Sequence, residues 1–420
     1  MPVAHPGPRP AVHFTPPTGW LNDPLGLTWH RGRYHLFYQA VPDSTVWQAW
    51  CHWGHASSPD LLEWTHHPVA LAPGEGDGGC WSGSVLPGEG DHPATIYYTA
   101  VDLADPDQGA VRVAHPQDED WHAWRKGPVI VRPPAGMRIF RDPSVLREGD
   151  GWRMLVGAGY DDGRPAVLTY TSSNGTDWQP DGELIVGTAL PGIMQGWECP
   201  HLITVGDRHV LIVSLWAEGE AGDVLAGVGR YAAGRLEVDT WCRLAQGPGH
   251  YAPTAFLDAD GRPGLLFWIK GIGDAAGEWS GALSVPYLIS VEDGEARLRP
   301  HPVLDGLAAD VRGSGTGPHV ISWRPDPASG PLTVISAAGT DSTDNTDNTD
   351  GTGGTGSLVT LRAVPGAVEV SAGGRTAGLP TGRDPVTVIV DGPVLEVCSG
   401  RGVLGLSLGA SVRASPGSGE

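Results

Sequence analysis

The chain has 420 residues, including 62 Gly, 38 Pro and 17 Trp, and its formal net charge is −21. This length exceeds what one hydrophobic core usually fills, so we expect two domains, and the many Trp and regular apolar runs exclude a disordered chain. The negative charge, with lysines only at Lys126 and Lys270, excludes the basic surface of a nucleic-acid-binding protein and suits a neutral substrate better.

The cysteines and the N-terminal residues indicate the cell compartment. Five cysteines are scattered without CxxC spacing, so neither a disulfide framework nor a zinc cluster is expected. Residues 1–10 lack the apolar core of a secretory signal, and no later segment has about 18 consecutive apolar residues. We therefore expect a cytoplasmic protein without a membrane-spanning segment.

Short polar or Pro-containing motifs recur about every 50 to 60 residues along the first 300 residues. They are Asn22-Asp23-Pro24, Trp81-Ser82-Gly83-Ser84, Arg141-Asp142-Pro143, Glu198-Cys199-Pro200 and Tyr251-Ala252-Pro253. We interpret each as a turn, because Asn, Asp, Gly and Pro favour turns.

A glycine and a run of strand-forming residues follow each motif. The runs are 34–38, 95–98, 152–156, 209–213 and 265–268. With no helical periodicity between them, they predict an all-β fold, a five-bladed β-propeller over residues 1–300. Radial packing would bring equivalent turns to one end of the central channel, so Asp23, Asp142 and Glu198 should share one pocket.

Beyond residue 300 the pattern changes to short alternating strands. The runs are 358–361, 367–370, 386–390 and 394–397, separated by Gly and Pro. They predict a β-sandwich domain over residues 301–420. Residues 340–357, rich in Asp, Asn, Thr and Gly, are expected to form a flexible low-complexity loop whose Asp spacing does not match a calcium-binding loop.

Each of the three acids has a simpler interpretation when taken alone. The Asp23 side chain could accept a hydrogen bond from the backbone of its own turn, and Asp142 could form a surface ion pair with Arg141. Glu198 could be a structural carboxylate. Their corresponding positions in a repeated architecture favour catalysis instead. Glycoside hydrolysis needs one ionised and one protonated carboxyl group, about 5 Å apart where configuration is retained, and this closeness raises one pKa.

The chain resembles glycoside hydrolase family 32, the invertases and related fructosidases, in six blocks that occur in the same order. The blocks are 13–24, 38–39, 52–64, 81–84, 140–143 and 197–200. The resemblance implies a five-bladed β-propeller followed by a β-sandwich, and Val390 through Val397 is similar to the family's sandwich signature.

The resemblance also implies a reaction and a set of site residues. The enzyme would be a retaining hydrolase that releases fructose from β-fructofuranosides such as sucrose or short fructo-oligosaccharides, through a covalent fructosyl-enzyme. Asp23 would be the nucleophile, Glu198 the general acid/base and Asp142 the transition-state stabiliser. The fructose subsite would contain Asn22, Gln39, Trp47, Trp81, Ser82 and Arg141. The chemistry needs no metal or cofactor, and we expect a structural role for His52 and His55.

Departures from the family pattern keep other functions open. Leu25 stands where Asn is usual, Gly249 and His250 replace Asp and Phe, and Pro286-Tyr287-Leu288 replaces Pro-Arg-Glu. We expect these differences to bear on substrate choice among sucrose, inulin and levan. The alternatives are a fructosyltransferase, a related enzyme acting on arabinosides, and a non-catalytic carbohydrate-binding or sensing protein. The partner in each case is a small saccharide, and the sequence carries no signal for the oligomeric state.

Overall fold

The computed structural model describes residues 9–408, apart from gaps at 91, 187–194, 218–219, 248, 275–276, 308–317, 329–330, 336–357, 373 and 383. The loop expected at 340–357 and most of the N-terminal stretch used to judge secretion therefore lie outside the described residues. The described part contains strands β1 to β29 and one short 3-10 helix, η1 (Pro302–Leu307). It includes no helix long and apolar enough to cross a membrane.

The first four antiparallel groups follow one another along the chain, and in each group every strand pairs with the next. The first two groups are β1 (Gly19–His30), β2 (Arg33–Val41), β3 (His52–Ser58) and β4 (Thr65–Leu71), then β5 (Gly79–Leu86), β6 (Thr95–Asp102), β7 (Asp105–Pro116) and β8 (Trp124–Val131). The next two are β9 (Met137–Glu148), β10 (Gly151–Tyr160), β11 (Pro165–Ser172) and β12 (Gln179–Glu183), then β13 (Gly196–Val205), β14 (Arg208–Ala217), β15 (Glu220–Ala232) and β16 (Arg235–Arg243).

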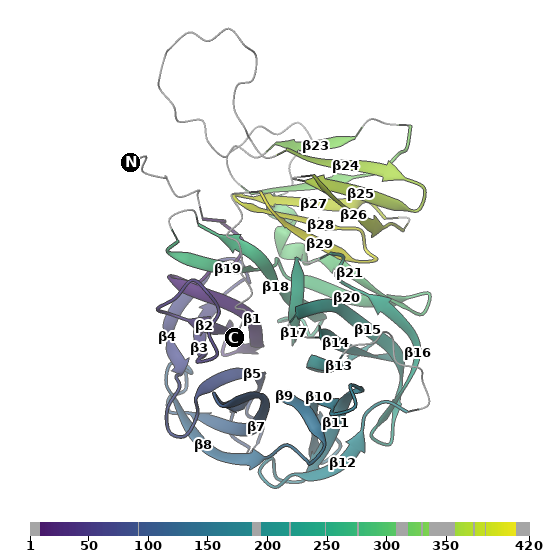
Figure 1. Cartoon of the computed structure of the whole chain (residues 1–420). Helices are drawn as coiled ribbons and strands as arrows, with labels where there is room; N and C mark the ends of the chain where they lie inside the picture. Colours follow the sequence, from purple (N-terminus) through teal and green to yellow (C-terminus); the bar gives the residue numbers. More distant parts are fainter. Residues whose placement is uncertain are drawn as a thin grey trace.

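The last group of this part closes on the first. It consists of β17 (His250–Leu257), β18 (Pro263–Gly273), β19 (Trp279–Leu283), β20 (Tyr287–Glu292) and β21 (Glu295–Pro300). Strand β19 pairs with β18 and also, in parallel, with β1. Figure 1 shows the groups around a common centre, with β1, β5, β9, β13 and β17 innermost. This arrangement is a β-propeller, as predicted, and the five predicted strand runs lie in β2, β6, β10, β14 and β18.

The five motifs interpreted as turns lie within the innermost strands, so that interpretation was wrong. Each motif coincides with a register shift in the pairing of its strand with the next one. A β-bulge of this kind inserts an extra residue and re-aims its side chain without ending the strand. Asp142, Cys199 and Ala252 have φ angles of 62°, 47° and 42°, which shows how sharply the backbone departs from the extended form.

Residues next to the bulges close the centre of the propeller. Pro24, Gly83, Pro143, Pro200 and Pro253, one from each innermost strand, line a cavity of about 10 Å³ beside the acids. That volume has room for about one water molecule. Proline has no N–H, so it leaves no unpaired donor where no further strand is available. The centre is therefore nearly filled next to the acids.

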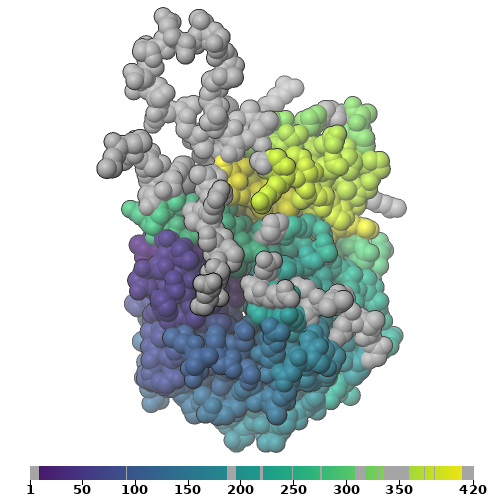
Figure 2. Space-filling view, in the orientation of Figure 1, coloured from purple at the N-terminus to yellow at the C-terminus, as the bar shows by residue number. Residues whose placement is uncertain are grey.

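The remaining strands form two four-stranded sheets that share an apolar core, the β-sandwich expected after the propeller. One sheet contains β22 (His319–Trp323), β27 (Val386–Asp391), β28 (Val394–Cys398) and β29 (Val403–Ser407). The other contains β23 (Leu332–Ile335), β24 (Leu358–Val364), β25 (Ala367–Ala372) and β26 (Arg375–Pro380). Figures 1 and 2 show the sandwich directly against the propeller. The proposed division at residue 300 would separate the two groups of strands.

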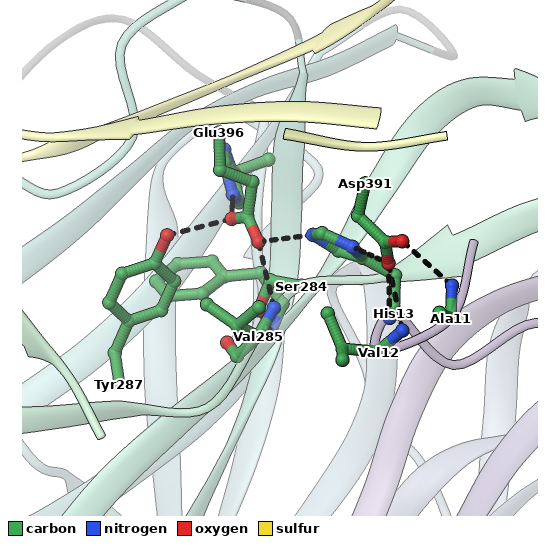
Figure 3. Close-up of polar contacts among 10 residues, drawn as sticks. Ala11, Val12, His13, Ser284, Val285, Tyr287, Asp391 and Glu396 are labelled. Carbon is green, nitrogen blue, oxygen red and sulfur yellow. Dashed lines mark hydrogen bonds and ion pairs between the residues drawn. The ribbon is translucent and has the colours of Figure 1, made fainter. Parts of the chain in front are cut away.

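A buried polar cluster joins the two parts, and we call His13, His250, Tyr287, Asp391 and Glu396 the interface cluster. Figure 3 labels all of its members except His250. Glu396 Oε1 accepts hydrogen bonds from His13 Nε2 at 2.8 Å and from the Val285 N–H at 2.7 Å. Its Oε2 accepts from the Tyr287 hydroxyl at 2.8 Å and lies 2.5 Å from His250 Nε2. One carboxylate of the sandwich thus binds three propeller segments.

Asp391 completes the cluster by holding the chain that leads into β1. Its carboxylate accepts from the backbone N–H groups of Ala11, Val12 and His13, and from His13 Nδ1 at 2.8 Å. Burial alone would favour a neutral imidazole, but the hydrogen bonds to Asp391 and Glu396 outweigh it and raise the pKa of His13 to about 9. The same bonds hold the pKa values of Asp391 and Glu396 below their usual range against the effect of burial.

Three of the residues that depart from the family pattern occupy buried positions in the fold. His250 and Tyr287 are fully buried and bind Glu396 in the interface cluster. Leu25 is buried in an apolar core with Phe37 and Trp53. Neighbouring side chains on a strand point to opposite faces, so a residue next to a site motif can belong to a different contact. His250 and Tyr287 thus join the two parts, whereas Leu25 packs in the core and also lines the central cavity beside Asp142. The effect of these differences on substrate choice stays a prediction.

Candidate active site

Asp23 is held by three other predicted site residues. Its Oδ1 accepts from Asn22 Nδ2 at 3.0 Å, and its Oδ2 accepts from the Ser82 hydroxyl at 2.5 Å. Gln39 Nε2 donates to Ser82 Oγ, and Asn22 Nδ2 donates to Gln39 Oε1 at 2.9 Å. The bulge in β1 and this chain of bonds fix the direction of the Asp23 carboxylate.

Asp142 is fixed through its backbone and its side chain. Its N–H donates to Thr99 Oγ1 at 2.7 Å, and the Thr99 hydroxyl donates to the Ser82 carbonyl at 2.8 Å. The Asp142 carboxylate accepts from the Cys199 N–H at 3.1 Å. The Cys199 thiol lies 3.7 Å from Asp142 Oδ2 and 3.8 Å from Asp23 Oδ2, so two of the predicted acids share one neighbour.

Glu198 is held at both oxygens. Its Oε1 pairs with Arg141 at 2.7 Å, and its Oε2 lies 2.5 Å from the Tyr251 hydroxyl, which is also 2.8 Å from the Leu215 carbonyl. When Glu198 is ionised, Tyr251 can donate to it. When Glu198 carries a proton, it can donate to Tyr251 while Tyr251 donates to Leu215. The surroundings therefore accommodate both protonation states.

Two tryptophan rings pack against Arg141, which was predicted to line the fructose subsite. The Arg141 guanidinium lies over the rings of Trp81 and Trp216, 5.5 and 5.0 Å from their centroids. Trp47 meets Trp81 edge to face at 5.7 Å and is 42% exposed, so it stands at the solvent side of the group. Such apolar faces are suited to packing against a sugar ring.

Burial and mutual repulsion raise the pKa values of Asp23 and Asp142. Withdrawal from water, with a further contribution from Glu198, raises the pKa of Asp23 to about 6 although Ser82 and Asn22 favour its ionised form. Withdrawal from water and the charge of Glu198 raise the pKa of Asp142 to about 7 despite Arg141. Carboxyl groups that resist being charged together can supply one ionised and one protonated member near neutral pH.

The structure thus brings together all nine predicted site residues, through direct contacts and through the shared neighbour Cys199. Other residues contact them and were not predicted as site residues, among them Thr99, Asp107, Cys199, Trp216 and Tyr251. Cys199 and Tyr251 belong to the repeated motifs, which is a signal that could have identified them. Thr99, Asp107 and Trp216 lie outside every motif.

The described residues contain no group of three or more His, Cys, Asp or Glu side chains arranged as metal ligands. His55 packs instead against the rings of His35, Phe37 and His67. All five cysteines are free thiols, and four of them are buried.

Comparisons with known proteins find a matching family model and related sequences. Residues 13–302 match the family model described as the glycosyl hydrolases family 32 N-terminal domain. A sucrose-6-phosphate hydrolase of Escherichia coli is 36% identical over 311 residues, 69% of this chain and 64% of that protein. A raffinose invertase of Escherichia coli is 33% identical over 318 residues, 71% of this chain and 66% of that protein. The chain thus matches slightly less than two thirds of the length of these relatives.

The fold also matches solved structures. A Bombyx mori GH32 beta-fructofuranosidase aligns with a TM-score of 0.77 at 23% identity, covering 95% of this chain and 89% of that one. This likeness supports the arrangement of propeller and sandwich described above.

Proposed function

The chain belongs to glycoside hydrolase family 32, and we propose that it is a retaining hydrolase that releases fructose from β-fructofuranosides. The observation that carries this proposal is the meeting of Asp23, Asp142 and Glu198, which come from three separate innermost strands. The Cys199 thiol lies beside both aspartates, and Glu198, the chain neighbour of Cys199, pairs with Arg141, the chain neighbour of Asp142. A retaining glycosidase needs a nucleophilic carboxylate and a second carboxyl group that exchanges a proton.

Asp23 attacks the anomeric carbon of fructose while Glu198 gives its proton to the leaving oxygen. Glu198, now ionised, then removes a proton from water, which attacks the fructosyl-enzyme and releases fructose. Hydrogen bonds from Asn22 and Ser82 keep the attacking carboxylate in one direction. Asp142, fixed by Thr99 and Cys199, binds fructose hydroxyls and stabilises the transition state.

The remaining predicted residues form the fructose subsite. Gln39 orients Ser82 and Asn22, and Trp81 packs over Arg141. Trp47, exposed at the solvent side, contacts the outer part of the substrate.

The substrate we propose is unphosphorylated sucrose or a short fructo-oligosaccharide. The net charge of −21 opposes an anionic substrate, and Arg141 is already paired with two carboxylates, Glu198 and Asp107. The related sucrose-6-phosphate hydrolases are named for a phosphorylated sugar. Comparing kcat/KM on sucrose and on sucrose 6-phosphate tests the choice, and we expect sucrose to give the larger value.

A panel of sucrose, 1-kestose, inulin and levan tests the proposed activity itself. We expect free fructose from sucrose and 1-kestose, with slower release from the polymers. Transfer of fructose into longer oligosaccharides at high sucrose would identify a fructosyltransferase instead. Binding of these sugars without any release of fructose would contradict the proposal and favour a carbohydrate-binding protein.

A further inference from the structure

Arg141 is shared between two carboxylates. Its Nη2 pairs with Glu198 Oε1 at 2.7 Å, and its Nη1 pairs with Asp107 Oδ1 at 2.9 Å. The guanidinium is 3% exposed and lies over the rings of Trp81 and Trp216, whereas the Asp107 side chain is 39% exposed. One buried cation therefore links Glu198 to a carboxylate at the surface of β7.

Asp107 cannot be explained as a partner needed to neutralise the pocket. Asp23, Asp142 and Glu198 already outnumber Arg141 there, and Asp107 adds one more negative charge. Its negative charge offsets part of the electrostatic effect of Arg141 on Glu198. An undivided positive charge beside Glu198 would favour the ionised carboxylate, whereas the first step of the reaction needs the protonated form.

We propose that Asp107 is a positioning residue for this reaction: by holding Arg141 Nη1 and opposing its charge, it lets Glu198 keep the proton that the leaving group requires. The inference rests on the proposed function, in which Glu198 is the general acid. It assigns Asp107 no contact with the reacting atoms.

Other groups face Glu198 in the described structure and must be unchanged in the test. They are Asp23 on β1, Asp142 on β9, Cys199 on β13, Tyr251 on β17 and Lys270 on β18, whose ammonium lies over the Tyr251 ring at 4.9 Å. None of them contacts Asp107 through a described hydrogen bond or ion pair. A substitution at Asp107 therefore acts on Glu198 chiefly through Arg141.

Asp107→Asn removes the charge and keeps an oxygen that can accept from Arg141. The pH dependence of kcat/KM on sucrose should then show an alkaline limb displaced to lower pH by about 0.5 to 1 unit, a loss of about three- to tenfold at pH 8. Asp107→Glu should return the limb toward its original position. Asp105→Asn, at an exposed position two residues away on β7, removes the same charge without this contact and should leave the limb in place.

The possible outcomes separate the two proposals. If Asp107→Asn and Asp105→Asn have the same alkaline limb while the wild type hydrolyses sucrose, the role of Asp107 is wrong and the proposed function stands. If Asp107→Asn lowers only the melting temperature, Asp107 is structural and the inference is again wrong. If the wild type releases no fructose from any substrate, both proposals fail.

Discussion

Asp23 and Asp142 in the pocket and Asp391 and Glu396 at the interface are all carboxylates withdrawn from water, yet their pKa values move in opposite directions. At the interface a charged His13 bridges both carboxylates, and the remaining oxygen positions accept from backbone N–H groups, Tyr287 and His250. In the pocket Arg141, the one arginine that pairs with the acids there in the described part of the chain, is divided between Glu198 and Asp107.

The difference shows what each group of carboxylates is suited to do. At the interface, hydrogen bonds to their oxygens stabilise the ionised forms of Asp391 and Glu396. The same bonds hold the propeller and the sandwich together. In the pocket, hydrogen bonds and Arg141 offset only part of the effect of burial, so the pKa values of Asp23 and Asp142 stay raised. The ionised forms of these two acids therefore destabilise the fold. The pocket acids should therefore matter for rate and the interface acids for stability.

The largest expected effect is on rate. Asp23→Asn should lower kcat on sucrose by at least about 1,000-fold, because the nucleophile is lost while the side chain keeps its shape. Circular dichroism should show an unchanged fold. Near-normal release of fructose by this variant would remove the central assignment.

Glu396→Gln should have the reverse effect. The substitution takes a charge from His13 and presents an NH₂ group to donors, so we expect a loss of about 3 to 5 kcal/mol in the free energy of unfolding. At temperatures where the variant is folded, kcat should stay within about twofold of the wild type, because Glu396 makes no contact with the pocket acids. Glu369→Gln, in a partly exposed ion pair with Arg362 on the sandwich, is the matched control and should lose less than about 1 kcal/mol.

The raised pKa of His13 predicts how the free energy of unfolding changes as the pH rises. A histidine whose folded-state pKa is raised from 6.5 to about 9 contributes stability that is complete below pH 6.5 and is lost as the pH rises through 9. Denaturant titrations between pH 6 and 9.5 should therefore show a decline of about 2 to 3 kcal/mol. His13→Gln should be less stable at pH 6 and should lack most of this decline. An equal pH dependence in both proteins would place the titrating group elsewhere.

The smallest expected effect has the opposite sign. Asp142→Asn should raise the free energy of unfolding by about 1 to 2 kcal/mol at pH 8, because a carboxyl group with a raised pKa opposes folding once it is ionised. Asn also tolerates the positive φ of this position. Thermal unfolding at pH 8 measures the change, and a melting temperature below that of the wild type would show that the pocket and interface acids do not differ as described.

The repeated motifs of the sequence were sufficient to predict the propeller and the acids that meet at its centre. They were not sufficient to show that Asp23 and Asp142 sit on bulged strands, because the residues that favour turns also favour bulges. Tyr251 had no predicted role, since its bond to Glu198 depends on how two strands pack.

His250 and Tyr287 show a second limit of reading the sequence alone. Both depart from the family pattern, His250 next to the fifth motif and Tyr287 further along the chain, and these departures suggested an effect on substrate choice. Their partner Glu396 is more than a hundred residues away in the sequence, within the sandwich. A pairing between distant residues of this kind leaves no periodic signal, whereas the spacing of the strands does.

The central claim, that Asp23 forms a covalent bond to fructose with the help of Glu198, is tested most directly by trapping the intermediate. β-Fructofuranosyl fluoride needs little protonation to leave, so Glu198→Gln should still form the fructosyl-enzyme, and its hydrolysis should be slow without the general base. Intact-mass measurement followed by peptide mapping should find one added fructosyl residue on Asp23, and none in a variant that also carries Asp23→Asn. An adduct on Asp142, or no adduct while fluoride is released at the wild-type rate, would contradict the account.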